Sequence, residues 1–436
     1  MKEKDHPDEI GHDHSQIGDV YEDKTYAHDA VFGEITEDGP NYRNVGWIGT
    51  VALMMKTQIG LGVLSIPSAF DTLGLVSGVI CLIALAAITT WSDYMIGVFK
   101  LHWIFVAGSG MLSMSISLNA VSTHGACTAI FVMVAAVVGF MFSSIRTLGR
   151  MTWLAWLGLF CILTSIFIVT IAVGVQNRPA AAPQDGIWVS DFKITNTPTF
   201  TQAISAVTSL VFAFAGTPAF FPIISEMRNP RRYTQALLIC QAGVTSIYIA
   251  IGCVIYYYCG SYVASPALGS AGPTMKKVSY GFALPGLAVS TILVTHLPAK
   301  YIFVRILRGS RHLTGNTIIH WVTWLSCTLA ITLIAYIIAS TIPAFDDLVS
   351  LVGALLGTVM SFQPMGCMWL YDNWTRGKTE RSPQWTMMVC WSTFVVVCGM
   401  FLMISGTYGA IVSIIDTYST SSGSAAWSCA DNSNST

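Results

Sequence analysis

Long apolar runs dominate this sequence and limit what it can fold into. Eleven runs of roughly 17 to 30 residues recur along the chain, each long enough to cross a bilayer as a helix. The chain is 53% hydrophobic and only 10% charged. Inside a bilayer the backbone can satisfy its hydrogen bonds only as helices or as a closed barrel. The sequence therefore predicts an all-α integral membrane protein with eleven transmembrane helices, at about 46–70, 73–98, 103–122, 126–142, 152–175, 201–225, 234–259, 281–303, 317–341, 346–371 and 385–414.

The two ends of the chain differ from the apolar part. Residues 1–44 are polar and acidic, and residues 416–436 are rich in Ser, Thr and Asn. Such compositions bury too little apolar surface to fold alone. We therefore expect a disordered cytoplasmic tail at 1–44, a transmembrane domain at 45–415 and a disordered extracytoplasmic tail at 416–436.

Lys and Arg residues indicate how the spans are inserted. If the N-terminus is cytoplasmic, the segments on that side hold 17 Lys or Arg residues and the opposite segments hold four, with Lys56 inside a span. An excess of this kind is the positive-inside pattern of membrane proteins. The sequence therefore predicts a cytoplasmic N-terminus and, after eleven crossings, an extracytoplasmic C-terminus.

Two of the spans are interrupted near their middle. The first contains Gly60 and Gly62 with Pro67 beyond them, and the sixth contains Gly216 and Pro218. These are the first spans of two five-span halves, which the predicted orientation inserts in opposite directions. Simple kinks are an alternative, because Gly and Pro are common in membrane helices. Two matched breaks in inverted halves favour a transporter site at the midplane of the bilayer.

The chemistry of such breaks points to a class of substrate. Unwound backbone in lipid is tolerated only where its N–H and C=O groups face a cavity or a ligand. N–H groups near Gly62–Leu64 suit a carboxylate, and carbonyl groups near Thr57–Ile59 and Phe214–Ala215 suit an ammonium group. A site that offers both is suited to a zwitterion.

Three segments resemble a known family. GWIGTVALMMKTQIGLGVLSIPSAF (46–70), FAFAGTPAFFPIISEMRNPRRY (212–233) and LVTHLPAKYIFVRILRGS (293–310) resemble the amino acid/auxin permease family, above all its fungal neutral amino acid permeases of the N amino acid transport system type. The resemblance extends over nearly all of residues 43–415. It implies a LeuT-like 5+5 inverted repeat plus one extra helix, as in the wider amino acid–polyamine–organocation superfamily. It also implies symport of neutral aliphatic and aromatic amino acids, with protons favoured over sodium as the coupling ion.

Carried onto this chain, the resemblance places substrate binding in the two breaks. The expected residues are Ile59, Gly60, Leu61, Gly62, Val63, Leu64 and Ser65 in span one, and Phe214, Ala215, Gly216, Thr217 and Pro218 in span six.

One junction departs from the family pattern. Family members have a substantial polar connection between spans two and three, whereas here residues 99–101 run almost directly into residues 102–104. The third span is left near the minimum length for crossing a bilayer. This pattern indicates a deletion of some tens of residues, and an inactive shortened isoform is therefore an alternative to a working transporter.

Ionisable residues within spans are costly and are functional candidates by default. Lys56 stands where relatives place a cation, or pairs with a carboxylate, or else extends to the cytoplasmic interface. Glu226 pairs with Lys56 as a gate or, alternatively, with Arg228 at the surface. Asp93 ends span two and is expected at the interface. These interpretations remain open at this point.

Span eight holds a further group of candidates. His296 is a candidate proton carrier, because an unperturbed imidazole titrates near pH ~6.5. A core histidine that forms hydrogen bonds is the alternative. Thr291 and Thr295 stand where sodium-coupled relatives supply oxygen ligands.

Other classes of function find no support in the sequence. It contains no nucleotide-binding, metal-binding or nucleophilic motif, so neither an enzyme nor a cofactor is expected. The net charge of −1 gives no reason to expect a nucleic acid partner. The predicted function is secondary active transport of neutral amino acids with protons across a lipid bilayer, in the plasma membrane rather than the vacuolar membrane. A membrane amino acid sensor without net transport is the rival from another class.

Overall fold

The computed structural model describes residues 28–29, 33–34, 44–60, 62–95, 103–123, 125–145, 148–179, 181–183, 185, 188–308, 310, 312–313, 315–341, 345–379 and 382–420. The described chain is almost entirely helical. Strands β1 (His28–Asp29) and β2 (Gly33–Glu34) pair antiparallel ahead of the first helix. Apart from these four residues and residue 44, the tail expected at 1–44 lies outside the described residues, as do residues 421–436.

Apolar helices account for all eleven predicted spans. Nine helical segments of the described chain are long and apolar enough to cross a membrane, and two shorter apolar helices lie at the third and fourth spans. The spans are α1 (Trp47–Gln58) with α2 (Ile66–Leu73), α3 (Leu75–Tyr94), α4 (Trp103–Ser122), α5 (Thr128–Ser143), α6 (Leu148–Val175), α7 (Phe200–Ala213) with α8 (Thr217–Ser225), α9 (Tyr233–Cys259), α10 (Pro273–Leu307), α11 (Ile318–Thr341), α12 (Phe345–Val352) with α13 (Thr358–Ser361) and α14 (Gln363–Thr379), and α15 (Pro383–Thr420). The prediction of an all-α membrane protein is confirmed.

Short irregular segments complete the chain. They are the 3₁₀ turns η1 (Gly62–Ser65), η2 (Pro230–Arg232), η3 (Gly260–Tyr262) and η4 (Ala267–Ser270), and the π-helical turn η5 (Gly353–Gly357) within span ten. Helix α15 continues to Thr420, past the predicted domain boundary at 415.

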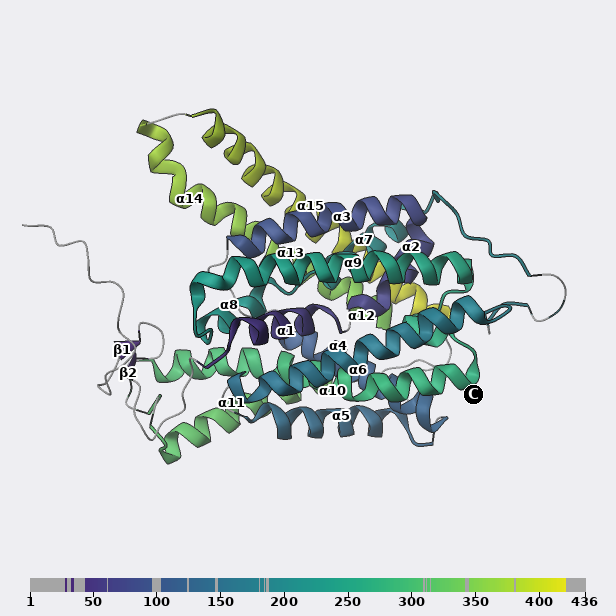
Figure 1. The fold of residues 1–436 in the computed structure, drawn as a ribbon, viewed down its shortest axis with the longest axis horizontal. Helices are drawn as coiled ribbons and strands as arrows, with labels where there is room; N and C mark the ends of the chain where they lie inside the picture. The colour runs from purple at the N-terminus through teal and green to yellow at the C-terminus, as the bar shows by residue number, and fades with distance from the viewer. Residues whose placement is uncertain are drawn as a thin grey trace, which may run out of the picture.

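The helices form two groups that lie one above the other in Figure 1. We call α1, α2, α3, α7, α8 and α9 the core bundle, because α9 packs on α1, α2 and α3, and α2 packs on α7. We call α4, α5, α6, α10 and α11 the scaffold, because α10 packs on α4, α5, α6 and α11. Helix α1 also packs on α6, so the first span lies where the two groups meet.

The two interrupted spans lie against each other and run in opposite directions. Helix α1 contacts α8, and α2 contacts α7, so the start of each span lies beside the end of the other. Figure 1 shows α1 and α8 toward one end of the bundle and α2 and α7 toward the other. The two five-span halves are therefore inverted. We call the end of the molecule where α1 begins the Trp47 end and the opposite end the Leu73 end.

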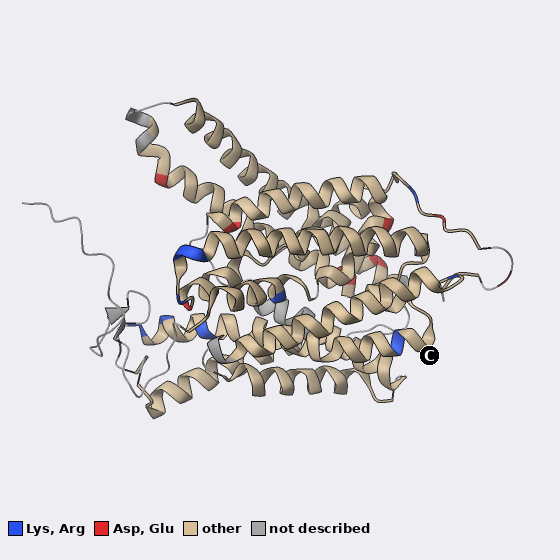
Figure 2. Ribbon diagram, viewed as in Figure 1, with Lys and Arg blue, Asp and Glu red and all other residues tan. Residues whose placement is uncertain are grey.

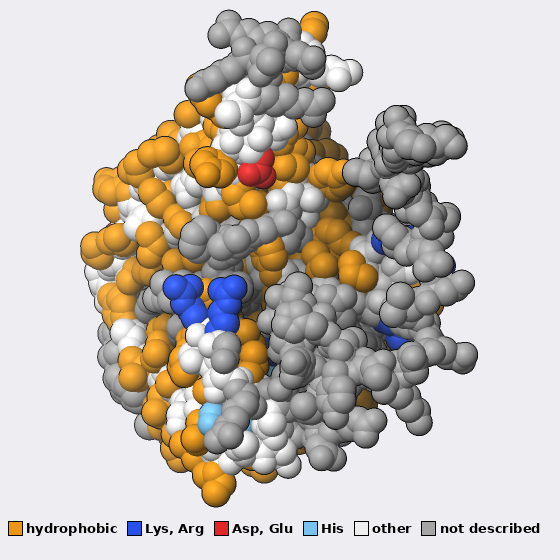
Figure 3. All heavy atoms as spheres, turned by 90° about the vertical axis from the view of Figure 1, so that its left-hand side faces the viewer, with side chains coloured by type: hydrophobic (Ala, Val, Ile, Leu, Met, Phe, Trp, Pro, Cys, Tyr) orange, Lys and Arg blue, Asp and Glu red, His pale blue; other side chains and the backbone are white. Residues whose placement is uncertain are grey.

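Charged residues lie mostly toward these two ends. Figure 2 shows the middle of the helices almost free of Lys, Arg, Asp and Glu. Arg231, Arg232, Arg305 and Arg308 are exposed at the Trp47 end, and Figure 3 shows Lys and Arg side chains on that face among apolar ones. This distribution is what a bilayer around the middle of the helices requires.

The last span is attached through a buried carboxylate. Asp347 lies in the first turn of α12, where the helix dipole favours negative charge, and its side chain is buried. It accepts hydrogen bonds from Ser413 Oγ (2.6 Å) and Thr417 Oγ1 (2.8 Å) of α15. Two hydroxyl donors thus join α15 to α12 at the Leu73 end.

We predict that Asp347→Ala destabilises the protein. Hydrogen bonds to a charged group contribute roughly 1.5–3 kcal/mol each, and the change leaves both hydroxyls without their acceptor. Thermal unfolding of the detergent-solubilised protein should therefore occur at a lower temperature. The matched control is Asp372→Ala, which removes an exposed carboxylate from α14. Equal transition temperatures for the two variants would contradict the role given to Asp347.

Candidate functional site

The two breaks pack against each other in a reciprocal way. A Cβ atom added to Gly62, just after the first break, would lie 2.4 Å from the Cα of Ala213, the last residue of α7. A Cβ atom added to Gly216, in the second break, would lie 2.8 Å from the Cγ of Gln58, the last residue of α1. Each break therefore touches the end of the helix that precedes the other. At Gly62 only glycine permits the two backbones to approach this closely, whereas the contact of Gly216 is with the Gln58 side chain.

Tyr248 of α9 joins the two helix ends. Its hydroxyl oxygen lies 2.8 Å from the carbonyl oxygen of Gln58 and 3.0 Å from that of Ala213. The side chain is fully buried, and its ring stands edge-on to Phe214 at 5.3 Å between centroids. The single hydroxyl proton can be donated to either carbonyl. Buried carbonyl groups that have lost their helical partners need such a donor.

Lys56 also binds the end of α1. Its ammonium group donates to the carbonyl oxygen of Ile59 (3.2 Å) and to Ser290 Oγ of α10 (2.5 Å). The residue is 1% exposed, so the interpretation that it extends to the interface is wrong. A cation at a helix C-terminus is favoured by the helix dipole. The carbonyl expected to receive a substrate ammonium group is therefore bound by the protein's own ammonium group.

Glu226 finds a partner that the sequence did not indicate. It forms an ion pair with Lys300 of α10, instead of the predicted Lys56 or Arg228. Both side chains are buried. The Glu226 carbonyl also accepts from the N–H of Val45 (3.0 Å), which fastens the start of span one to the end of span six. The core bundle and the scaffold are thus held together at the Trp47 end.

The other candidates on α10 face the scaffold. His296 Nδ1 lies 3.0 Å from the carbonyl oxygen of Ser143 in α5, and its ring packs edge-on against Trp324 of α11. Thr291 donates to the carbonyl of Leu287 within α10 (3.0 Å). The Thr295 hydroxyl has no partner among the described residues. None of these contacts reaches the breaks.

The expected substrate-binding residues lie together. Gln58 and Ala213 precede two short breaks, and every described residue predicted for substrate binding is buried. These are Ile59, Gly60, Gly62, Val63, Leu64, Ser65, Phe214, Ala215, Gly216, Thr217 and Pro218, whereas Leu61 lies outside the described residues. Span eight also reaches them, because a Cβ atom on Gly60 would lie 2.7 Å from Ser290 Oγ.

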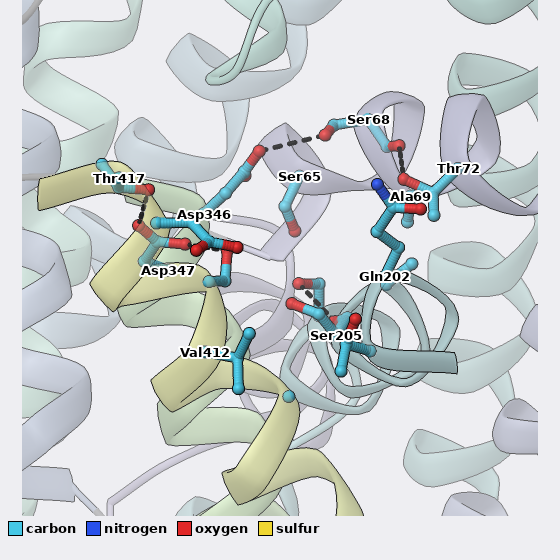
Figure 4. Close-up of a pocket in the computed structure, with 16 residues that line it drawn as sticks. Ser65, Ser68, Ala69, Thr72, Gln202, Ser205, Asp346, Asp347, Val412 and Thr417 are labelled. Carbon is cyan, nitrogen blue, oxygen red and sulfur yellow. Dashed lines mark hydrogen bonds between the residues drawn. The ribbon is translucent and has the colours of Figure 1, made fainter. Parts of the chain in front are cut away.

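A polar cavity lies beside the first break on its Leu73 side. Its volume is about 350 Å³, and α2, α7, α12 and α15 surround it (Figure 4). Ser65, the last residue of η1, is part of its lining. Its lining includes several Ser and Thr hydroxyl groups and the carboxylates of Asp346, Asp347 and Asp416. Ser68 Oγ donates to Asp346 Oδ2 across the cavity wall (3.0 Å).

Comparison with known proteins decides the family. A family model described as transmembrane amino acid transporter protein matches residues 43–110 and 97–412. The chain belongs to the transmembrane amino acid transporter family. This is the amino acid/auxin permease family that the three sequence segments resemble, and it is a family of transporters rather than enzymes. The description of the chain as a multi-pass membrane protein follows from the family and from the apolar helices.

Two fungal relatives align with almost the whole of this transporter-family chain. A transmembrane transporter of Gibberella moniliformis is 32% identical over 428 residues, covering 91% of this chain and 90% of its own. The N amino acid transport system protein of Neurospora crassa is 28% identical over 434 residues, covering 91% of each chain. Among solved structures, a nucleobase-cation-symport-1 family transporter in a closed conformation superposes with a TM-score of 0.49 at 11% identity, covering 91% of this chain and 98% of its own.

Several residues at the breaks and at the Trp47 end were not singled out from the sequence. They are Gln58, Tyr248 and Ser290 at the breaks and Lys300 at the Trp47 end. Gln58 and Lys300 are polar residues within or next to apolar runs, and that signal was available. Tyr248 carries no local signal, because a tyrosine in a span is usually an interfacial or packing residue.

We predict that Tyr248→Phe loosens the two breaks. The change removes one hydroxyl and leaves the Gln58 and Ala213 carbonyls without this donor, at a cost of roughly 1–3 kcal/mol. Thermal unfolding in detergent should therefore shift to lower temperature. Tyr258→Phe is the matched control, because Tyr258 is 42% exposed on the same helix. Equal unfolding temperatures for the two variants would show that the Tyr248 hydrogen bonds to Gln58 and Ala213 contribute nothing to stability.

Proposed function

We propose that this protein is a secondary active transporter that imports neutral amino acids together with protons. In this proposal the core bundle moves against the scaffold around the two breaks, so that the site opens to one side of the membrane at a time. The reciprocal packing of the breaks, joined by Tyr248, is the observation that carries the proposal. It places two helix ends with polar backbone groups at one buried point between the halves, as a midplane transporter site requires.

The apolar lining of the breaks supports a neutral substrate. Ile59, Val63 and Phe214 are fully buried there, and an ionised substrate side chain placed among them would lack a partner. In this proposal the N–H groups near Gly62–Leu64 bind the carboxylate and the carbonyl groups at the helix ends bind the ammonium group, which all amino acids share. The substrate's ammonium group would then compete with Lys56 and Tyr248 for the carbonyl groups at the two breaks.

The described conformation supports access from the Leu73 end. The cavity reaches Ser65 from that side, whereas the Glu226–Lys300 ion pair holds the Trp47 end together. In the proposed cycle an amino acid arrives through the cavity, the breaks close on it, and separation of Glu226 from Lys300 opens the Trp47 end. The excess of Lys and Arg at that end supports a cytoplasmic N-terminus. Import then runs toward the cytoplasm, and we assign the protein to the plasma membrane rather than the vacuolar membrane.

Protons are preferred to sodium as the coupling ion for a structural reason. A sodium ion at the end of α1 needs several oxygen ligands, and the oxygen atoms there include the Ile59 carbonyl and the Ser290 hydroxyl. Both already bind the Lys56 ammonium group. His296 as the proton carrier stays a prediction.

Two rival functions lead to different observations. An amino acid sensor would bind substrate without net flux. A shortened, inactive isoform would neither bind nor transport the substrate. The two family matches overlap at residues 97–110, around the short junction, and this overlap supports the idea of a deletion there.

We predict accumulation of labelled L-leucine and L-phenylalanine in sodium-free proteoliposomes that carry an inward proton gradient. A proton symporter must concentrate its substrate under these conditions and must stop doing so when a protonophore collapses the gradient. Equal uptake with and without the gradient would overturn the proton coupling. Binding without flux would favour the sensor, and the absence of both would favour the inactive isoform.

We further predict that Gly62→Ala abolishes amino acid binding while the protein still inserts and folds. The added methyl group would collide with the Ala213 backbone and force the two breaks apart. Binding of labelled L-leucine to the detergent-solubilised protein measures the effect. Gly46→Ala is the control, because a Cβ atom there meets nothing within 4 Å. Unchanged affinity in Gly62→Ala would place the substrate elsewhere.

A further inference from the structure

A buried acid lies beside the second break. Asp93 is the penultimate residue of α3, and the sequence predicted it at the membrane interface. In the structure its side chain is 0% exposed, so whatever its depth it is covered by protein. The amide nitrogen of Gln241 in α9 donates to its Oδ2. The hydroxyl of Tyr233, also in α9, donates to its backbone carbonyl (2.8 Å). The carboxyl group is therefore enclosed between α3 and α9.

Three polar atoms at this place lack a partner among the described residues. They are Oδ1 of Asp93, Oε1 of Gln241 and Oγ1 of Thr217, all on residues that are at least nine-tenths buried. The Thr217 hydroxyl faces the Asp93 carboxyl group but does not reach hydrogen-bonding geometry with it. Buried polar atoms are normally paired, but Oδ1 of Asp93 and Oε1 of Gln241 are both acceptors, and the single Thr217 hydroxyl can donate to only one of them. Among the described residues the cluster therefore lacks one donor.

In the part of the chain that the structure describes, no cation supplies that donor. Helix α3 packs mainly on α2, α7, α8, α9 and α13, and none of these helices contains Lys, Arg or His. The titratable groups that face Asp93 from α9 are Tyr233 and Cys240, and Asp71 of α2 lies near the Leu73 end. A carboxylate buried in a membrane span without a cation is very costly, whereas a carboxylic acid is not. The acid form also has an O–H donor for Gln241 Oε1 or Thr217 Oγ1.

The position of the acid ties its protonation to the breaks. Thr217 is the first residue of α8, and the preceding Gly216 packs against Gln58 at the end of α1. A proton on Asp93 allows α3, α9 and the start of α8 to remain packed together. After the proton leaves, the charged carboxylate needs water, which can enter only if these helices separate.

We propose that Asp93, with Gln241 and Thr217 as its hydrogen-bonding partners, is the site that binds and releases the coupled proton. The carboxylate takes up a proton when the site communicates with the Leu73 side, and the carboxylic acid gives the same proton to water when the Trp47 end opens. This assignment rests on the proposed proton symport and goes beyond it by naming the acid.

The test compares transport modes in proteoliposomes that contain the full chain. Wild-type protein is measured first, for L-leucine accumulation driven by a proton gradient and for exchange of labelled against unlabelled L-leucine without a gradient. Asp93→Asn keeps the size of the side chain and mimics the protonated form. It should lose gradient-driven accumulation and the pH dependence of uptake while retaining exchange, because exchange needs no net release of a proton. Asp372→Asn, an exposed carboxylate on α14, is the matched control and should behave as wild type.

The outcomes separate the two proposals. If transport by the wild type does not depend on the proton gradient, the proposed proton symport is wrong, and so is the assignment of Asp93. A different result is that the wild type responds to the gradient while the Asp93→Asn variant still accumulates L-leucine with the same pH profile. That result would overturn the assignment of Asp93 and leave the proton symport standing. His296→Gln is measured in parallel. Loss of coupling in that variant, with coupling intact in Asp93→Asn, would return the role to His296.

A spectroscopic measurement decides the case in which Asp93→Asn loses exchange as well. Infrared difference spectra of the purified protein at two pH values report the C=O stretch of buried carboxylic acids. A band that changes with pH in the wild type and is missing in Asp93→Asn supports the proposal. The same band in both proteins would overturn it.

Discussion

In this fold two helices end in the middle of a membrane, and the hydroxyl of Tyr248 donates a hydrogen bond to the carbonyl groups at their ends. At each break the last carbonyl groups of a helix lose their partners, and in lipid no water replaces them. The structure places the two ends side by side, so that one buried donor serves Gln58 and Ala213 together. The close contacts of Gly62 and Gly216 are what bring these ends within reach of a single side chain. The inverted halves therefore meet at a point that neither half could stabilise alone.

Buried charges in the described chain are handled in three different ways. Lys56 is placed against carbonyl and hydroxyl oxygens at a helix C-terminus, where the dipole favours a cation. Glu226 and Lys300 neutralise each other. Asp93 has an amide donor but no cation among the described residues, and in our proposal its charge is removed by protonation. Because the cost of a bare charge in a membrane is high, each arrangement depends on the helices that supply the partners staying in contact.

The sequence predicted the spans and the breaks because both are local signals. Apolar length marks a span, and Gly and Pro within it mark an interruption, so the boundaries near Gln58 and Ala213 could be anticipated without knowing the packing. Partners across the fold could not be predicted in this way. Lys56 and Ser290 are 234 positions apart, and Tyr248 is 190 positions from Gln58. The sequence offered Glu226 two partners, Lys56 on span one and Arg228 two residues further along the chain. Its actual partner, Lys300, lies on span eight. Asp93 looked interfacial because it ends an apolar run, yet α9 covers it.

These contacts make α8 the element that connects the Trp47 end, the buried acid and the two breaks. It is a nine-residue helix, and each of its ends meets an ionisable group of another helix. Its first residue, Thr217, faces Asp93 of the core bundle, and just past its last residue Glu226 is paired with Lys300 of the scaffold. In the proposed transport cycle, separation of Glu226 from Lys300 would displace α8, and with it Thr217 relative to Asp93 and Gly216 relative to Gln58. The proposed gate at the Trp47 end, the buried acid and the two breaks are therefore connected through a single helix, which is the kind of linkage that the proposed coupling of a proton to an amino acid requires.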